Sequence, residues 1–585
     1  MTNHLVLEVA TTRWFMDWSM DAETEKMLWH LAIQNAVEYD GKGSPGSVIG
    51  RVMSIRQDLR QYGKIISPII AQNVAKANQL ATENGIEYLK QILENEAPDL
   101  LQEREKKERR EGLPELNNIT NGKIVLRFAP NPNGPLSFGH ARGITINGEY
   151  AKKYDGELIL RFDDTDTSKK PPLREAYQTI EQEAEWILGF KPHRIVIASD
   201  RIEKYYEYAE KMLSENFGYV CQCSADDFRE YRINKTDCPC RSNSITENLL
   251  LWKNMLAEEF NPGDAVVRVR TDMSLKNPAL RDWPALRIQD TKKNPHPRIE
   301  IGSKYTVWPL LDFQSAVEDH LQGVTHIIRG KDLMDSTRKQ TLLYEHFGWQ
   351  YPETMYWGRV KVHEWGGFST SQMRIDIENG MYRGWDDPRL PTLSALRGRG
   401  ITADALRNFW IELGVTQKDI SVPLATLYSH NVKIIDDDAP RLSFVRDPVA
   451  IDAGGLDISA VELPRHPNDS SQGFRTIDIS GGELFIESND IGHDKLRLKE
   501  FGDFDISDNR AEFVAMERTD KRPIVHWCSK NSSKNGKLIM VKDGQIAEIS
   551  GRIEDHNLQK GQHVQIERIG YAIVKDSTTL IFCHD

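Results

Sequence analysis

The string RFAPNPNGPLSFGHAR (127–142) combines residue types that suit a phosphate-binding turn. KIVLRF (Lys123–Phe128) favours a strand, the Gly/Pro-rich turn around Gly134 favours a tight reversal, and a helix is expected to open near Gly139 and His140. A helix N-terminus presents free N–H groups and the positive end of the helix dipole, which attract a phosphate. His140 is then expected to donate a hydrogen bond to that phosphate. An ordinary βα turn is the alternative for an isolated Gly-His pair.

Carboxylates gather at the end of a second apolar segment. ELILRF (Glu157–Phe162) favours a strand, and Asp163, Asp164 and Asp166 follow it directly. A carboxylate in a low-dielectric cleft can hold the ammonium group of an amino acid. The alternative is that Asp166 and Thr167 act as turn formers and helix caps.

Four of the six cysteines form a C-x-C…C-x-C pattern within one short window; they are Cys221, Cys223, Cys238 and Cys240. Four thiolates close a tetrahedral shell around Zn²⁺ and leave no open position, so the pattern predicts a structural zinc. Four reduced, buried thiols, or a degenerate site that has lost its metal, are the alternatives. Cys528 and Cys583 stand alone and are expected to be packing residues.

The composition is that of a globular protein. Of 585 residues, 39% are hydrophobic and 28% are charged, and the formal net charge is −12, which argues against indiscriminate coating of nucleic acid but not against a local basic face. The sequence contains no run of about 18 apolar residues, so no transmembrane helix is predicted. The N-terminal sequence MTNHLVLEVATTRWF lacks the pattern of a secretory signal, so we expect a cytoplasmic protein with no membrane partner.

The first 115 residues are predicted to be helical. Apolar residues recur at helical spacing in TEKMLWHLAIQNAVEY (24–39) and in VAKANQLATENGIEYLKQIL (74–93). GKGSPGSVIG (Gly41–Gly50) is expected to be a loop between helices. The charge run from Glu103 is expected to be a solvated helix end and a linker to the next domain.

Strands and helices alternate over 120–215. Besides the two strands above, PPLREAYQTIEQEAEWILGF (171–190) is predicted to be a helix and RIVIAS (194–199) a third strand. This alternation predicts a parallel, Rossmann-like sheet with helices on both faces, and the turns after the first two strands should face one crevice.

The rest of the chain is expected to form four parts. A window at 216–305 interrupts the alternation and holds the cysteines. The alternation resumes over 306–385 with YTVWPLLDF and VTHIIRGKD, and 386–440 is helical again. Short alternating segments separated by turn residues predict antiparallel β-barrels over 441–585. The fold class is therefore α/β and multidomain.

Ser137-Phe138-Gly139-His140 resembles the His-Ile-Gly-His signature of class I aminoacyl-tRNA synthetases in the form used by the glutamyl/glutaminyl family, with Ser in place of the first His. The resemblance covers most of the chain, is strongest over 123–401 and is closest to the archaeal glutamyl type. It implies that the following residues bind ATP: Pro130, Asn131, Pro132, Asn133, Gly134, Ser137, Gly139, His140 and Ser371.

FSTSQMR (Phe368–Arg374) resembles the second class I signature, Lys-Met-Ser-Lys-Ser, a mobile loop whose lysines stabilise the charge of the leaving pyrophosphate. Ser369 and Gln372 occupy the two lysine positions, and Arg374 is expected to supply the positive charge. The alternative is a plain Ser/Thr-rich turn. With Ser137, Gly139 and His140, the resemblance makes Gln372 and Arg374 the expected catalytic residues.

The resemblance also implies an amino-acid site. Asp163 is expected to contact the substrate α-amino group and Arg127 its carboxylate. Arg329 is expected to pair with a side-chain carboxylate, because a guanidinium gains little from a neutral amide, so the site should prefer glutamate over glutamine. The alternatives are a surface arginine for Arg127 and a structural ion pair with Asp332 for Arg329.

Two further substrate contacts are expected from the same resemblance, at Asp312 and Ser315. Leu311 stands where many family members have a substrate-contacting tyrosine, and Asp312 stands where bacterial glutamyl enzymes usually have Asn.

The resemblance implies an enzyme that activates L-glutamate with ATP and Mg²⁺ and transfers it to the 3′-terminal adenosine of tRNA-Glu. Archaeal enzymes of this type commonly charge only tRNA-Glu, and the resemblance leaves open an enzyme that also charges tRNA-Gln. The zinc would brace an insertion that binds the tRNA acceptor end, and the barrels would read the anticodon. The alternatives are a glutaminyl-tRNA synthetase and a non-catalytic tRNA-binding protein on the same scaffold.

Overall fold

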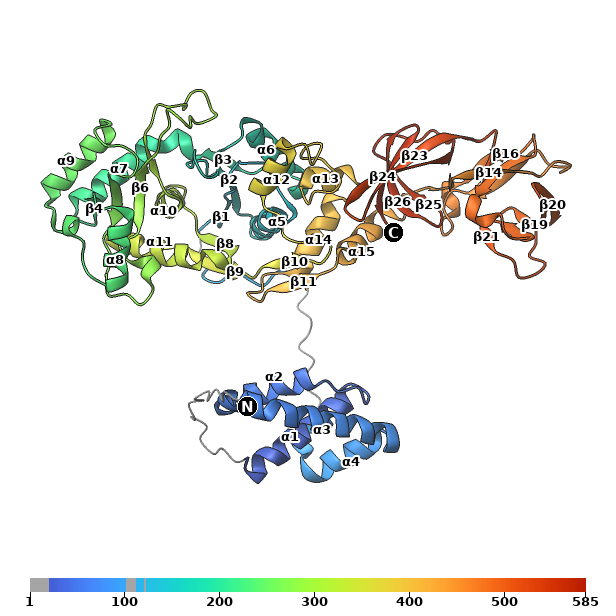
Figure 1. Ribbon diagram of the computed structural model, residues 1–585, viewed down its shortest axis with the longest axis horizontal. Helices are drawn as coiled ribbons and strands as arrows, with labels where there is room; N and C mark the ends of the chain where they lie inside the picture. The colour runs from blue at the N-terminus through green and yellow to red at the C-terminus, as the bar shows by residue number, and fades with distance from the viewer. Residues whose placement is uncertain (1–19, 102–111, 120–121) are drawn as a thin grey trace, which may run out of the picture. The chain divides into compact units, whose positions relative to one another are not determined.

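The computed structural model describes residues 20–101, 112–119 and 122–585 (Figure 1). The N-terminal sequence tested for a secretory signal lies outside these residues, as does the charge run from Glu103 through residue 111. The chain divides near residue 110 into two compact units. None of the described helices is long and apolar enough to cross a membrane.

The first unit is helical, as predicted. Its helices are α1 (Ala22–Glu38), α2 (Pro45–Ile55), α3 (Gly63–Asn84) and α4 (Ile86–Glu96). The expected loop at 41–50 is wrong in its second half, because Pro45 occupies the first turn of α2, a position where its fixed φ favours a helix. The predicted helix at 74–93 is interrupted at Gly85, whose φ of 80° ends α3.

The second unit contains the predicted parallel sheet. Strands β1 (Val125–Phe128), β2 (Glu157–Phe162) and β3 (Arg194–Ile197) pair in parallel in that order. Helices α5 (Phe138–Lys153) and α6 (Arg174–Leu188) connect them. The backbone N–H of Asp163 donates to the carbonyl of Pro130 at 3.0 Å, so the turns after β1 and β2 do lie together.

Later segments of the chain extend this parallel sheet layer, and an inserted antiparallel part separates its two halves in the sequence. The second half consists of α10 (Leu311–Leu321), β8 (His326–Gly330), α11 (Met334–Phe347), β9 (Glu353–Trp357), β10 (Val360–Val362) and α12 (Thr370–Glu378). Strand β8 runs parallel to β9 and lies beside β1, where Thr325 N–H donates to Val125 O at 2.9 Å. The interruption is an antiparallel sheet with three helices, and it extends beyond the predicted window 216–305 at both ends. The sheet contains β4 (Gly218–Cys221), β5 (Val266–Val269), β6 (Pro284–Ile288) and β7 (Val307–Pro309), and the helices are α7 (Ile202–Ser214), α8 (Ala225–Asn234) and α9 (Ile245–Leu256).

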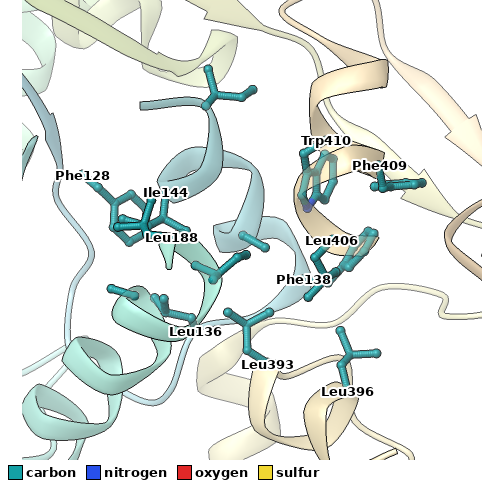
Figure 2. Packing of buried hydrophobic residues seen from close by; sticks show 14 of the residues in the cluster. Phe128, Leu136, Phe138, Ile144, Leu188, Leu393, Leu396, Leu406, Phe409 and Trp410 are labelled. Atoms are coloured by element: carbon teal, nitrogen blue, oxygen red, sulfur yellow. The ribbon is translucent and has the colours of Figure 1, made fainter. Parts of the chain in front are cut away.

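The helices expected after residue 386 are α13 (Leu393–Gly398), α14 (Ala403–Leu413) and α15 (Leu424–Ile435), with the short strand β11 (Ile420–Val422) paired to β10. Phe138, beside the signature Gly139, packs against α14, with ring centroids 4.7 Å from Trp410 and 5.4 Å from Phe409 (Figure 2). This packing anchors the start of α5 in the core.

The C-terminal region is rich in strands, as predicted, and forms two seven-stranded sheets within the described residues (Figure 1). The first sheet, in spatial order, is β12 (Arg441–Leu442), β25 (His563–Ile566), β26 (Gly570–Asp576), β27 (Thr579–His584), β23 (Ser533–Lys542), β24 (Gln545–Glu554) and β13 (Phe444–Arg446). The second is β21 (Ile524–Val525), β18 (Lys495–Leu498), β19 (Gly502–Ser507), β20 (Arg510–Ala515), β14 (Pro448–Asp452), β17 (Glu483–Glu487) and β22 (Cys528–Ser529). A separate antiparallel pair joins β15 (Ala460–Pro464) to β16 (Phe474–Asp478). Most pairings are antiparallel, but four are parallel: β12 with β25, β23 with β27, β14 with β20 and β18 with β21.

Candidate active site

The first signature forms a capped helix start. The hydroxyl of Ser137 accepts from the backbone N–H of His140 at 3.4 Å, and the backbone N–H of Ser137 donates to His140 Nδ1 at 3.2 Å. Because Nδ1 accepts, the neutral imidazole carries its proton on Nε2. Burial lowers the pKa of His140 to about 4, and the charge of Lys170 acts in the same direction. His140 is therefore a neutral donor at pH 7.

The turn that follows β1 contacts the second signature. A Cβ at Gly134 would lie 2.6 Å from Thr370 Cγ2, so this position requires glycine. The side chain of Asn133 donates to Ser371 Oγ at 3.5 Å. Asn131 Nδ2 donates to the carbonyl of Lys170 at 3.4 Å. The turn predicted to bind ATP thus lies between the β2 turn and α12.

The second signature is a helix rather than a loop, which corrects our expectation for Phe368–Arg374. Ser369 caps α12 by accepting from Gln372 N–H at 3.2 Å, the contact that Ser at an N-cap favours. The Gln372 side chain donates to Asp376 at 2.8 Å. Arg374 pairs with Glu378 at 2.9 Å. Both predicted catalytic side chains therefore have partners on α12 itself.

A cavity of about 910 Å³ separates the two signatures. Ser137, Gly139 and His140 line one part of it, and Ser369 and Thr370 line another. Its remaining lining includes apolar side chains, among them Trp357, Val360 and Trp365, and three cationic ones, Arg142, Arg359 and Lys361. Gln372 and Arg374 are not among the lining residues. A cavity with an apolar part and a positively charged part suits a nucleotide.

A buried charge network lies beneath the ends of β1 and β2. Arg127 donates through Nε to Asp319 at 3.1 Å, and Arg161 donates to Asp319 at 2.6 Å and to Asp163 at 2.7 Å. Arg161 also donates to Ser315 Oγ at 2.6 Å. The network brings together Arg127, Asp163 and Ser315, three of the predicted substrate contacts. The alternative of a surface arginine at Arg127 is wrong, since this side chain is buried.

Burial raises the pKa of Asp163, although the charge of Arg161 opposes this effect. For Asp319 burial also favours the protonated form, but Arg127 and Arg161 outweigh it and lower the pKa. Asp319 therefore stays ionised and balances the charge of the arginines, whereas a further cation nearby would favour the ionised form of Asp163.

Arg329, at the end of β8, is 6% exposed and has only neutral partners among the described residues. Its Nη2 donates to Thr337 Oγ1 at 2.7 Å, to Gln340 Oε1 at 3.0 Å and to Tyr351 OH at 2.7 Å. Its Nε is buried without a hydrogen-bond partner. The alternative of an ion pair with Asp332 is wrong. Burial lowers the pKa of Arg329, and the positive charge of Arg127 adds to this effect.

Asp312 is not part of the network. It lies in the first turn of α10 and pairs with Lys339 of α11 at 2.7 Å. Its charge is thus already compensated, and substrate contact by Asp312 stays a prediction.

The four predicted zinc ligands come together at β4 and the turn after α8. Their Sγ atoms all lie within 4.8 Å of one another, with Cys221 and Cys238 at 3.9 Å and Cys223 and Cys240 at 3.7 Å. These distances are too long for disulfides. Four sulfurs about 2.3 Å from a tetrahedral Zn²⁺ would lie about 3.8 Å apart. The geometry of the cluster therefore fits the metal.

Sequence reasoning missed two groups of residues that the structure places at the site. Asp319 and Arg161 complete the charge network, and Gln340 and Tyr351 hold Arg329. A signal existed for Asp319, because Ser315 and Asp319 are four residues apart and so share one face of α10. The partners of Arg329 come from segments whose proximity only the fold creates.

A parallel α/β sheet with a cavity and a buried network of charged side chains near the ends of its strands is typical of α/β enzymes, which bind their ligands at this edge of the sheet. Two family models match the chain: "tRNA synthetases class I (E and Q), catalytic domain" over residues 123–437 and the corresponding "anti-codon binding domain" over 439–519. The chain therefore belongs to the glutamyl/glutaminyl family of class I tRNA synthetases.

Archaeal relatives match nearly the whole chain. The chain is 41% identical to a glutamate–tRNA ligase of Methanosarcina barkeri over 97% of its own length and 100% of the relative. It is 44% identical to a glutamate–tRNA ligase of Methanosarcina mazei over 87% of this chain and 90% of that one. A crystal structure of a glutamate tRNA ligase from Elizabethkingia meningosepticum in complex with its amino acid is 19% identical, with a TM-score of 0.40 over 54% of this chain and 71% of that chain.

Proposed function

We propose that this protein is a glutamate–tRNA ligase, which activates L-glutamate with ATP and transfers the glutamyl group to the 3′-terminal adenosine of tRNA-Glu. The observation that carries the proposal is the buried Arg329, whose charge has no carboxylate partner among the described residues. The relatives named glutamate–tRNA ligase, at 41–44% identity, support the same substrate.

Charge balance favours glutamate over glutamine. The buried network and its neighbour contain three cations, Arg127, Arg161 and Arg329, and two anions, Asp163 and Asp319, which leaves one positive charge in excess. Zwitterionic glutamate carries one net negative charge and glutamine carries none. Binding glutamine would leave Arg329 uncompensated in a low-dielectric site, which is costly.

The α-amino group of glutamate would approach Asp163, where a cation offsets the burial that raises the pKa of this carboxyl. Arg127 would face the α-carboxylate, because it lies in the same network at the end of β1. With the substrate held at both ends, catalysis needs no covalent nucleophile. It would come from positioning of the α-carboxylate against the nucleotide and from stabilisation of the phosphate charge.

The cavity between the signatures would hold ATP. His140 would donate Nε2–H to a phosphate oxygen, and Ser137 would keep the imidazole in that orientation. Class I synthetases use ATP and Mg²⁺. Asp332 is the one carboxylate that lines the cavity in the described part of the chain, so the metal would be held largely through the phosphates of the nucleotide.

The cysteine cluster would hold a structural Zn²⁺ through four thiolates. The backbone N–H of Gln222 donates to Cys240 Sγ at 3.4 Å and would support a metal-bound thiolate. When bound, the metal would close a cross-link between β4 and the turn at Cys238. We assign the surrounding window, 216–305, to binding of the tRNA acceptor end.

The same proposal assigns 441–585 to the anticodon, 120–215 and 306–385 to the catalytic domain, 386–440 to stem contacts and 1–115 to a separate helical region. A cytoplasmic location agrees with this function. Charging of tRNA-Gln in addition to tRNA-Glu is compatible with the site, because the amino-acid pocket does not read the tRNA.

The test is aminoacylation of total tRNA with labelled glutamate and labelled glutamine in parallel. We expect charging with glutamate only. Charging with glutamine would mean that Arg329 has been misread and would favour a glutaminyl enzyme. Binding of tRNA without charging by either amino acid would indicate the non-catalytic alternative, with Ser137 and Gln372 as marks of a lost active site.

A further inference from the structure

Glu183 lies on α6, is 6% exposed and contacts the residue that precedes the first signature. One carboxylate oxygen accepts from the backbone N–H of Leu136 at 2.7 Å, and the other accepts from the hydroxyl of Ser394 at 2.6 Å. These two donors belong to segments that are far apart in sequence. A single buried side chain therefore joins the turn after β1 to the start of α13.

The two segments also contact each other through their backbones. Phe138 N–H donates to Pro391 O at 2.8 Å, and Leu393 N–H donates to Leu136 O at 2.8 Å. Leu136 and Leu393 lie side by side in the core (Figure 2). The N–H of Leu136 has no place in this backbone pairing, and Glu183 is the group that accepts it. Without the carboxylate, this buried N–H would lose its partner.

The bridged segments carry walls of the nucleotide cavity. Leu136 immediately precedes Ser137, which caps α5 and orients His140, and Pro391 lines the same cavity as His140. We propose that Glu183 is a positioning residue for the nucleotide: by accepting from Leu136 and Ser394 it fixes the helix cap that aims His140 into the cavity. This inference rests on the proposed function in placing ATP there.

A carboxyl in this position is unfavourable for the fold alone. Burial raises the pKa of Glu183 to about 7, an effect that its two hydrogen bonds and the charge of Arg397 only partly offset. Its neighbours on the core face of α6 are Ile180, Ala184 and Ile187, which are ordinary core residues. The hydrogen bonds to Leu136, beside the signature, and to Ser394, on α13, explain why a carboxyl stands among them.

The test compares four variants in ATP–pyrophosphate exchange with tRNA present. Glu183→Ala removes both acceptors, and Glu183→Gln keeps an acceptor for Leu136 N–H and a donor for Ser394. Ser394→Ala removes one arm only, and Glu185→Ala alters an exposed glutamate of the same helix as the matched control. ATP and glutamate are varied separately, and thermal melting reports folding.

We expect Glu183→Ala to lower kcat/KM for ATP by about tenfold, the factor that corresponds to loss of one hydrogen bond to a charged group, with KM for glutamate changed by less than about twofold. Ser394→Ala should lower it less, by about threefold, because the hydrogen bond from Leu136 N–H to Glu183 remains. Glu183→Gln should restore ATP use, and Glu185→Ala should match the wild type.

In a folded Glu183→Ala, a rise in KM for glutamate as large as the loss in kcat/KM for ATP would overturn the inference, as would a folded Glu183→Gln that does not restore ATP use. If Glu183→Ala does not fold, an unchanged ATP dependence in Ser394→Ala overturns it. A wild type without exchange activity would refute the proposed function instead. ATP titration by calorimetry then tests Glu183 separately, since the positioning role requires weaker ATP binding in the variants.

Discussion

Replacing Arg329 by methionine removes the guanidinium and keeps an unbranched side chain. In the wild type this charge is buried against the neutral oxygens of Thr337, Gln340 and Tyr351. If the γ-carboxylate of glutamate supplies the missing countercharge, Arg329→Met leaves that carboxylate buried and unpaired. The loss of one partner from a buried pair is about 3–5 kcal/mol, which corresponds to a fall of about two to four orders of magnitude in kcat/KM for glutamate.

The same substitution, which should lower glutamate use, should not lower the free energy of unfolding. An uncompensated buried charge destabilises the free enzyme, so Arg329→Met should be at least as stable as the wild type. An arginine with a purely structural role would show a lower melting temperature when replaced. Activity and stability thus separate the two roles of Arg329.

The assay is ATP–pyrophosphate exchange with tRNA present, with glutamate and ATP varied in turn, together with tRNA binding and thermal melting. KM for ATP and tRNA binding should stay within about threefold of the wild type, since Arg329 does not line the nucleotide cavity. Equal losses in glutamate use and tRNA binding would refute the reasoning. So would a loss in glutamate use below about tenfold, because a desolvated ion pair cannot contribute so little.

Three further predictions follow from the site. The purified protein should contain about one zinc per chain, and metal analysis showing well under one would contradict the assignment. Cys221→Ser should lower both the zinc content and the binding of an acceptor minihelix. The pKa of His140 is lowered to about 4, so native His140 stays neutral at pH values where the unfolded residue takes up a proton. The free energy of unfolding should therefore fall as the pH decreases from about 6.5 to 4. Denaturant titrations should show a weaker pH dependence for His140→Asn. For Glu183 the pKa is raised from 4.5 to about 7, so the wild type should lose stability relative to Glu183→Gln as the pH rises from about 4.5 to 7, by about 3 kcal/mol at the plateau above pH 7. Parallel pH profiles of the two proteins would contradict this.

The sequence predicted the local elements of the site well. The apolar runs that became β1 and β2, and the Gly/Pro turn that follows β1, depend on neighbours in the chain and on turn chemistry. The cysteine cluster was predictable because thiolate spacing is itself local. Local patterns failed where one residue changed the outcome, as at Pro45, which begins a helix inside a Gly-rich stretch, and at Gly85, which ends one.

Contacts across elements could not be predicted in the same way. Glu183 reads as one more charged residue of an amphipathic helix, and only the fold shows that it accepts from Leu136 and Ser394. The second signature likewise reads as a loop with a free arginine. In the structure it is a helix in which Arg374 pairs with Glu378 four residues later, a spacing that favours ion pairs on helices.

The two arginines at the ends of β1 and β8 show what such long-range contacts decide. Arg127 and Arg329 have the same side chain, similar burial and the same kind of position at a strand terminus. Helix α10 places Asp319 against Arg127, whereas the segments around Arg329 offer it only hydroxyl and amide oxygens. A carboxylate that enters this site therefore gains more from Arg329 than from Arg127, because no carboxylate of the described residues pairs with Arg329. On the proposed function, specificity for the acidic side chain would then depend as much on the absence of a carboxylate beside Arg329, among the residues that the structure describes, as on the arginine itself.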